Sequence, residues 1–222
     1  ILEGKKISGQ YAAKDYLQDF NQISQALSSG LDFTEWINIY QKLVNWSIEL
    51  DKHREIGLEQ SLNDQFKEAN KEFSKFVERN YISWLNVNDK ADAPNLSPQI
   101  TEKYVLNHIR DEGKSIFYFV LDCLRLDQWL VMEKHLTDLF NIEKDYYYSI
   151  LPTATPYARN ALFAGLYPSD IEKNYPNLWV SGNDDDSSMN RYEKELLQHL
   201  IDRKRIKLRN ELKYIKIIDP EV

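Results

Sequence analysis

Residues 115–127 read Ser115-Ile-Phe-Tyr-Phe-Val-Leu-Asp-Cys-Leu-Arg-Leu-Asp127, an apolar run that ends in a carboxylate. The apolar part has the length of a buried strand and is far shorter than the ~20 residues of a membrane helix. Burying a carboxylate at the end of such a strand is costly, and a divalent metal offsets that cost. Asp122 is therefore a candidate metal ligand. A residue in this position also often caps the following helix, and spacing alone does not separate the two interpretations.

A second polar segment follows the next predicted strand and reads Leu151-Pro-Thr-Ala-Thr-Pro-Tyr-Ala-Arg-Asn-Ala-Leu-Phe-Ala-Gly165. Thr155 is placed as the N-cap of a helix, with Pro156 at the preferred first helical position. A helix N-terminus attracts anions such as a phosphoryl group, and Arg159, one turn later, could add a charged donor. An ordinary threonine cap explains the same residues, so both interpretations stay open.

Helices and strands alternate around these two segments. The pattern predicts helices over 98–110, 126–140, 155–165 and 189–209, and strands over 115–121, 145–151 and 214–218. Such alternation is typical of an α/β fold with a mostly parallel sheet, which binds ligands at the carboxyl ends of its strands. Three strands are usually too few for a complete sheet of this kind. We therefore expect residues 91–222 to be the N-terminal part of a larger α/β domain.

The first part of the chain has a different pattern. Residues 1–85 carry apolar side chains at steps of three and four, which predicts amphipathic helices. Gly30 stands where a helix would end, and Asp32 with Glu35 resembles a capping box. We expect a three-helix bundle over residues 1–90, joined to the α/β part by a polar linker at 86–98. The predicted stripes comprise Ala13, Tyr16, Leu17, Phe20, Ile23 and Leu27, then Phe33, Trp36, Ile37, Tyr40, Leu43 and Val44, then Leu62, Phe66, Ala69, Phe73, Phe76 and Val77.

Composition narrows the class of protein. Of its 222 residues 42% are hydrophobic, enough for a core, which excludes intrinsic disorder. The net charge of -7 argues against broad electrostatic capture of nucleic acid. Its single cysteine, Cys123, excludes an intrachain disulfide framework and is expected to be a buried structural thiol. The N-terminus lacks the pattern of a signal peptide, so we expect a cytoplasmic protein without membrane insertion.

Two motifs together resemble a known family. Phe119-Val-Leu-Asp-Cys-Leu-Arg125 resembles the strand that carries the first metal-binding aspartate in the alkaline phosphatase superfamily. Pro152-Thr-Ala-Thr-Pro-Tyr-Ala-Arg-Asn-Ala-Leu-Phe-Ala-Gly165 resembles the nucleophile turn of that superfamily in its PglZ variant. The helical region before them is similar to that of PorX-type response regulators, in which a receiver domain and a helical bundle precede a PglZ domain. The resemblance covers about residues 1–95 as the bundle and 96–222 as the front of the PglZ domain.

The resemblance implies a zinc-dependent phosphodiesterase that acts on linear or cyclic oligonucleotides and regulates type IX secretion. Asp122 would be a zinc ligand, and Thr155 both a zinc ligand and the nucleophile, in a site with two zinc ions. Arg159 and Asn160 would contact the substrate phosphate. A sensor kinase and regulatory proteins would act through the receiver domain, and an unpaired sheet edge after residues 214–218 would allow a homodimer. The alternative is a non-catalytic signalling and protein-interaction module of a two-component system.

The sequence departs from the family in its histidines. None of His53, His108, His135 and His199 lies in the Asp-x-x-x-His pattern of the later ligands. We therefore expect this chain by itself to be inactive and to bind zinc weakly or not at all. Two charged segments are expected to be solvated: the acidic loop Asp184–Asp186, and the basic run 203–209 on the face of a helix.

Overall fold

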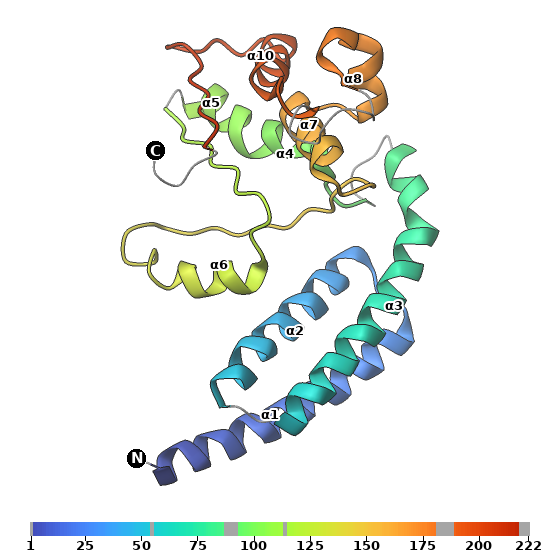
Figure 1. Ribbon diagram of the computed structural model, residues 1–222, viewed down its shortest axis with the longest axis vertical. Helices are drawn as coiled ribbons and strands as arrows, with labels where there is room; N and C mark the ends of the chain where they lie inside the picture. The colour runs from blue at the N-terminus through green and yellow to red at the C-terminus, as the bar shows by residue number, and fades with distance from the viewer. Residues whose placement is uncertain (1, 54–55, 87–92, 113–114, 181–188, 218–222) are drawn as a thin grey trace. The chain divides into compact units, whose positions relative to one another are not determined.

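The computed structural model describes residues 2–53, 56–86, 93–112, 115–180 and 189–217 (Figure 1). The chain divides into two units. The first unit is Ile1–Pro94 with Cys123–Asp145, and the second is Asn95–Asp122 with Tyr146–Val222. No helix in the described ranges is long and apolar enough to cross a membrane.

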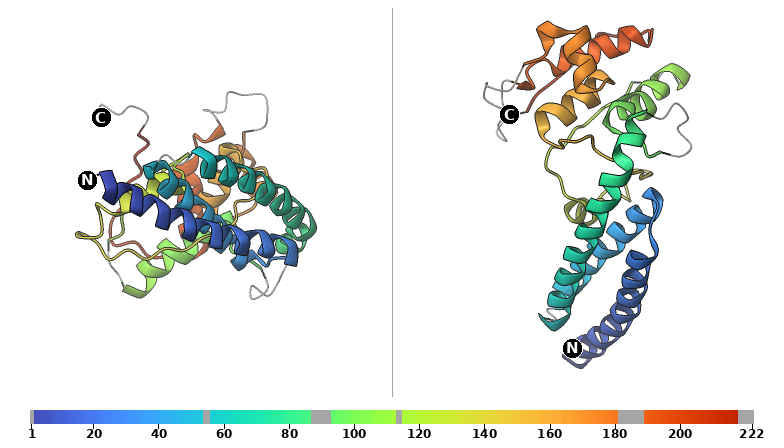
Figure 2. Two further views of the ribbon diagram at one scale, coloured as in Figure 1. Left: turned by 90° about the horizontal axis from the view of Figure 1, so that it is seen from below. Right: turned by 90° about the vertical axis from the view of Figure 1, so that its right-hand side faces the viewer.

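The first unit is built on the helices that the apolar spacing predicts. These are α1 (Leu2–Ser29), α2 (Phe33–His53) and α3 (Ile56–Asn86), and each contacts the other two. Figure 2 shows them running side by side. The apolar stripes meet in a shared core, except that Leu17 and Tyr40, also predicted to lie on them, are 52% and 48% exposed. The buried side chains include Tyr16, Ile23, Trp36, Leu43, Leu50, Leu62 and Phe76.

The turn between α1 and α2 confirms the predicted caps. Gly30 has a positive φ of 81°, a left-handed conformation that glycine adopts without a steric penalty. Asp32 Oδ1 accepts hydrogen bonds from the amides of Thr34 and Glu35, both at 2.8 Å, and the Asp32 amide donates to Glu35 Oε2 at 2.8 Å. Hydrogen bonds from the Thr34 side chain and the Glu35 amide hold the pKa of Asp32 below its usual range.

A polar contact also joins α1 to α2. Lys42 Nζ lies 2.9 Å from Asp19 Oδ1, and Trp46 Nε1 donates to Asp19 Oδ2 at 3.0 Å. Burial alone would raise the pKa of Asp19, but the hydrogen bonds from Lys42 and Trp46 lower it below its usual range. The contact therefore favours the ionised carboxylate.

The first unit also contains α6 (Leu126–Glu133), which packs against α2. The helix predicted over 126–140 is too long, because residues 134–139 form turns. Several amides in this stretch bond to carbonyls three residues back, as His135 does to Met132 and Leu136 to Glu133. Thr137 and Phe140 do bond four residues back, to Glu133 and Leu136, but these bonds alternate with the tighter ones and form no continuous α-helix.

The second unit begins with a continuous helical stretch, which confirms the helix predicted over 98–110. It consists of α4 (Ser97–Thr101), the π-helical η2 (Glu102–Leu106) and α5 (Asn107–Glu112). The end of the predicted linker also belongs to this unit: Ser97 is buried, and its hydroxyl oxygen accepts from the Ile150 amide at 3.1 Å.

Four further helical segments complete the described part of the second unit. They are α7 (Thr155–Ala164), α8 (Pro168–Asn174), the 3-10 helix η3 (Pro176–Leu178) and α10 (Glu193–Arg203). The sequence pattern did not predict α8 and η3, although each starts with a proline, which is favoured at a first helical position. The helix predicted over 189–209 is shorter, since Arg205 adopts a positive φ of 54° just beyond α10.

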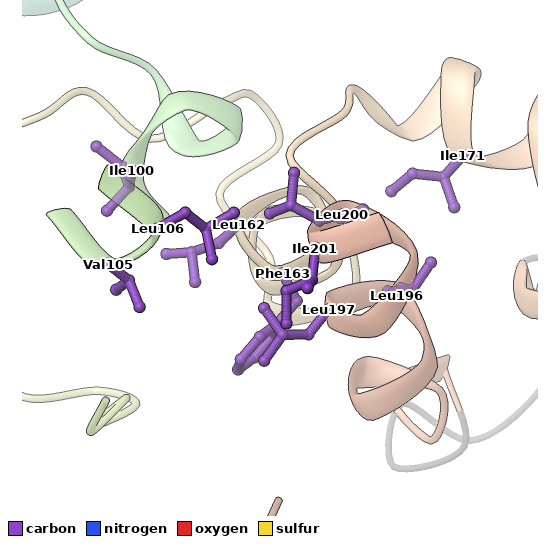
Figure 3. Packing of buried hydrophobic residues seen from close by; sticks show 11 residues of the cluster. Ile100, Val105, Leu106, Leu162, Phe163, Ile171, Leu196, Leu197, Leu200 and Ile201 are labelled. Atoms are coloured by element: carbon purple, nitrogen blue, oxygen red, sulfur yellow. The ribbon is translucent and has the colours of Figure 1, made fainter. Parts of the chain in front are cut away.

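Five helical segments enclose the core of this unit: α4, η2, α7, α8 and α10 (Figure 3). The close contact of α7 with α10 depends on Gly165, which ends α7 with a φ of 59°. A Cβ atom there would lie 2.7 Å from Leu200 Cδ1. Arg203 also donates from α10 to the Ala164 carbonyl at the end of α7. The core comprises Ile100, Val105, Leu106, Leu162, Phe163, Ala164, Ile171, Leu196, Leu197, Leu200 and Ile201.

The expected α/β fold with a mostly parallel sheet is wrong. The described ranges contain no strand, and the pairing that they show is an isolated parallel bridge between Leu96 and Tyr148. None of the three predicted strands therefore forms over its described residues; Ile218 lies outside them.

The physical reason is visible in residues 115–121. Their apolar pattern does select an exposed side and a packed side: Phe117 and Phe119 are 83% and 78% exposed, whereas Tyr118 and Val120 pack against the core. A strand also requires a neighbouring backbone to pair with, and a single-sequence pattern does not supply one. The same holds for residues 214–217, where Ile215 and Ile217 are exposed.

Candidate active site

The two segments singled out in the sequence meet in the second unit. Asp122 follows residues 115–121, and Thr155 is the first residue of α7. The Thr155 hydroxyl donates to Asp122 Oδ2 at 3.4 Å. The predicted cap is displaced by one residue, because Ala154 is the N-cap and no side chain caps this end. The Thr155 hydroxyl thus bonds a carboxylate from another segment and does not cap its own helix.

Arg159 lies one turn further along α7 and bridges two carboxylates. Its Nη1 is 3.2 Å from Asp122 Oδ2, and its Nη2 is 2.7 Å from Glu193 Oε2. Burial alone would lower the pKa of Arg159, but the charges of Glu193 and Asp122 raise it above its usual range. The guanidinium is therefore a fixed positive charge beside the Thr155 hydroxyl.

Glu193, the first residue of α10, is the site residue that the sequence analysis missed. Its side chain is 0% exposed, and its Oε2 accepts from the Tyr214 hydroxyl as well as from Arg159. Burial and the hydrogen bond to Glu193 raise the pKa of Tyr214 above its usual range. No local signal marks Glu193, because glutamate is common in the first turn of solvent-exposed helices.

Asn160 is buried in the hydrogen-bond network behind Thr155. Its Nδ2 donates to the Met189 carbonyl at 3.0 Å, and its Oδ1 accepts from Asn190 Nδ2 at 3.3 Å. Asn190 Nδ2 also lies 3.4 Å from the Thr155 carbonyl. Asn160 thus ties α7 to residues 189–190, and its contact with a substrate phosphate stays a prediction.

The candidate metal donors are Asp122 and the Thr155 hydroxyl. Within the described ranges, no group of three or more His, Cys, Asp or Glu side chains could hold a metal ion. His199 stacks on Tyr175 with ring centroids 4.5 Å apart, and His108 and His135 are exposed. The acidic residues Asp184–Asp186 lie outside the described residues.

One smaller expectation is wrong and another is only half right. Cys123 is exposed, because it lies in a turn with a φ of 57° and not in a buried strand. The basic run 203–209 is not on a helix face, since α10 ends at Arg203, but its arginines and Lys207 are exposed, as expected. Arg203 bonds the Ala164 carbonyl, and Lys204 pairs with Glu102 at 2.5 Å.

Comparison with protein families gives two matches. Residues 100–219 match the model of the BREX system PglZ alkaline phosphatase-like domain. Residues 6–85 match the model of the PorX response regulator linker domain. The order of the two matches is that of the PorX-type architecture which the sequence resembles. No curated protein matches the chain.

Proposed function

Because the chain belongs to the family of PglZ alkaline phosphatase-like domains, we propose that it forms part of a zinc-dependent phosphodiesterase. In this proposal Asp122 is a zinc ligand and Thr155 is both a ligand and the nucleophile. The observation that carries it is the 3.4 Å separation between the Thr155 hydroxyl and Asp122 Oδ2. Two oxygens that bind the same zinc at about 2 Å each must lie about this close together.

The residues fit zinc as part of a donor set. A carboxylate oxygen is a common zinc ligand, and Asp122 already balances a positive charge, the Arg159 guanidinium at 3.2 Å. A catalytic zinc takes about three protein ligands, so the remaining ligands would come from residues outside the described ranges. Zinc held here would polarise a phosphate ester and lower the pKa of the Thr155 hydroxyl.

The chain's own side chains prepare this chemistry. Asp122 accepts the hydrogen bond of the Thr155 hydroxyl and so fixes the direction of Oγ1. Thr155 stands at the N-terminus of α7, where the helix dipole favours a negatively charged phosphoryl group. Arg159 supplies charged hydrogen-bond donors on the same side, and such donors suit phosphoryl oxygens.

The biological setting is also a proposal, supported by the PorX response regulator linker match. We infer that the substrate is a linear or cyclic oligonucleotide and that the enzyme regulates type IX secretion. A sensor kinase would act through a receiver domain. The homodimer expected from an unpaired sheet edge loses that support, because residues 214–217 form no strand.

The test uses the native protein that carries this chain. Its zinc content and its hydrolysis of bis(p-nitrophenyl) phosphate and a short oligonucleotide are measured for the wild type and two variants. Asp122→Ala should lose zinc and hydrolysis together. Thr155→Ala should keep most of the zinc but lower kcat/KM by about 10³-fold or more, as expected when a nucleophile is removed.

Asp127→Asn is the matched control, because Asp127 pairs with Arg125 at 2.7 Å in the first unit and should not affect zinc or hydrolysis. A wild-type protein with neither zinc nor hydrolysis would contradict the proposal. That result would favour the alternative, a non-catalytic signalling and interaction module.

A further inference from the structure

A buried carboxylate lies behind the candidate active site. Glu193 is 0% exposed, whereas Asp122 is 42% exposed, and Arg159 connects them. In the described part of the chain, Glu193 Oε1 and Arg159 Nε are buried without a hydrogen-bond partner. The second carboxylate oxygen, Oε2, accepts from both Arg159 and Tyr214.

The two bonds of Arg159 are unequal. The bond to Glu193 is 2.7 Å and buried, and the bond to Asp122 is 3.2 Å and partly solvated. A charge as deeply buried as that of Glu193 depends on its partner cation, because water does not stabilise it. Arg159 is therefore anchored on Glu193 and holds Asp122 with its weaker contact.

We propose that Glu193 is a positioning residue that anchors Arg159, so that Arg159 can release Asp122 to a cation and stay beside Thr155 for a phosphoryl oxygen. This inference rests on the proposed function. Without the charge of Glu193, Asp122 is the remaining charged partner of the guanidinium among the described residues. The guanidinium would then compete with the cation for Asp122. It would no longer be available to bind a phosphoryl oxygen.

The experiment measures zinc affinity by chelator competition, and inhibition by inorganic phosphate, in the native protein that carries this chain. Glu193→Gln keeps the shape of the side chain and removes its charge. It should weaken the binding of zinc and of phosphate about tenfold each. A tenfold change in affinity corresponds to the free energy of one hydrogen bond to a charged group. Adding Arg159→Met to Glu193→Gln should restore zinc affinity, because the guanidinium that competes with zinc for Asp122 is gone. Phosphate binding should stay weak.

Two controls separate this role from a general loss of structure. Glu195→Gln changes an exposed glutamate on the same helix and should alter neither affinity. Tyr214→Phe removes a hydrogen bond to Glu193 but leaves its charge, and should change zinc affinity less than about threefold. Circular dichroism checks that every variant is folded. If Glu193→Gln does not fold, the double variant is tested alone, with near wild-type zinc affinity and weakened phosphate binding expected.

The inference is overturned if Glu193→Gln behaves like Glu195→Gln. It is also overturned if the double variant binds zinc as weakly as Glu193→Gln, because a structural role gives no restoration. For the double variant tested alone, zinc binding about tenfold weaker than wild type would have the same consequence. Wild-type protein that neither binds zinc nor hydrolyses a phosphodiester would instead overturn the proposed function, and this inference with it.

Discussion

Each of the two units places an aspartate near the start of a helix, and the two aspartates are used differently. Asp32 in the first unit bonds the amides of residues two and three positions ahead, so its carboxylate serves its own helix. Asp122 in the second unit bonds Thr155 and Arg159, which are 33 and 37 positions away. The first arrangement is local and stabilises a turn. The second gathers charged and hydroxyl groups from separate segments, which is what a reactive site requires.

If the units have separate cores, a core substitution in one should leave the other intact. Leu200→Ala in the second unit should cost about 2–5 kcal/mol of unfolding free energy, because it leaves a cavity where Leu200 is 0% exposed. Leu43→Ala is the counterpart in the first unit, where Leu43 is 2% exposed. Urea unfolding monitored by circular dichroism should show two transitions. Leu200→Ala should shift one of them and Leu43→Ala the other. A single transition shifted equally by both would mean that the units unfold together.

A smaller effect is expected at the two glycines that end helices in left-handed conformations. Gly165→Ala should cost about 2–3 kcal/mol, since backbone strain adds to a Cβ placed 2.7 Å from Leu200 Cδ1. Gly30→Ala should cost about 1 kcal/mol, because no atom lies within 4 Å of the added Cβ. Thermal unfolding of both variants checks the difference. Equal losses would show that the α7–α10 contact adjusts freely.

The smallest effect concerns the helix starts themselves. Asp32→Ala removes a cap and should cost about 1 kcal/mol of unfolding free energy. Thr155→Ala removes no cap and should change stability by less than about 0.5 kcal/mol. Chemical unfolding of the two variants decides between these values. A Thr155→Ala variant as destabilised as Asp32→Ala would mean that the Thr155 hydroxyl mainly stabilises the fold.

The difference between the units also explains what the sequence predicted. The three helices of the first unit follow from local signals: apolar spacing, Gly30 and the Asp32–Glu35 capping box. Asp122 and Thr155 were identified by their motifs. A shared metal led us to expect their side-chain oxygens about 4–6 Å apart, which is too long, because two zinc–oxygen bonds of about 2 Å span at most about 4 Å. The structure brings them to 3.4 Å, joined by a hydrogen bond.

Long-range features were not predictable from the sequence. Glu193 looks like any glutamate in a first helical turn, and only the packing of α10 against α7 buries it against Arg159. Residues 115–121 show which side chains face inward, but not whether another backbone lies alongside to make a sheet. Burial and pairing therefore had to come from the three-dimensional structure.

Cys123 has a practical consequence for following this protein in solution. It is the chain's single cysteine, it is exposed, and it is joined directly to Asp122 at the junction between the two units. A maleimide dye would therefore attach at one position of this chain without any engineering. Its fluorescence would offer a way to test whether a cation reaches the neighbouring carboxylate.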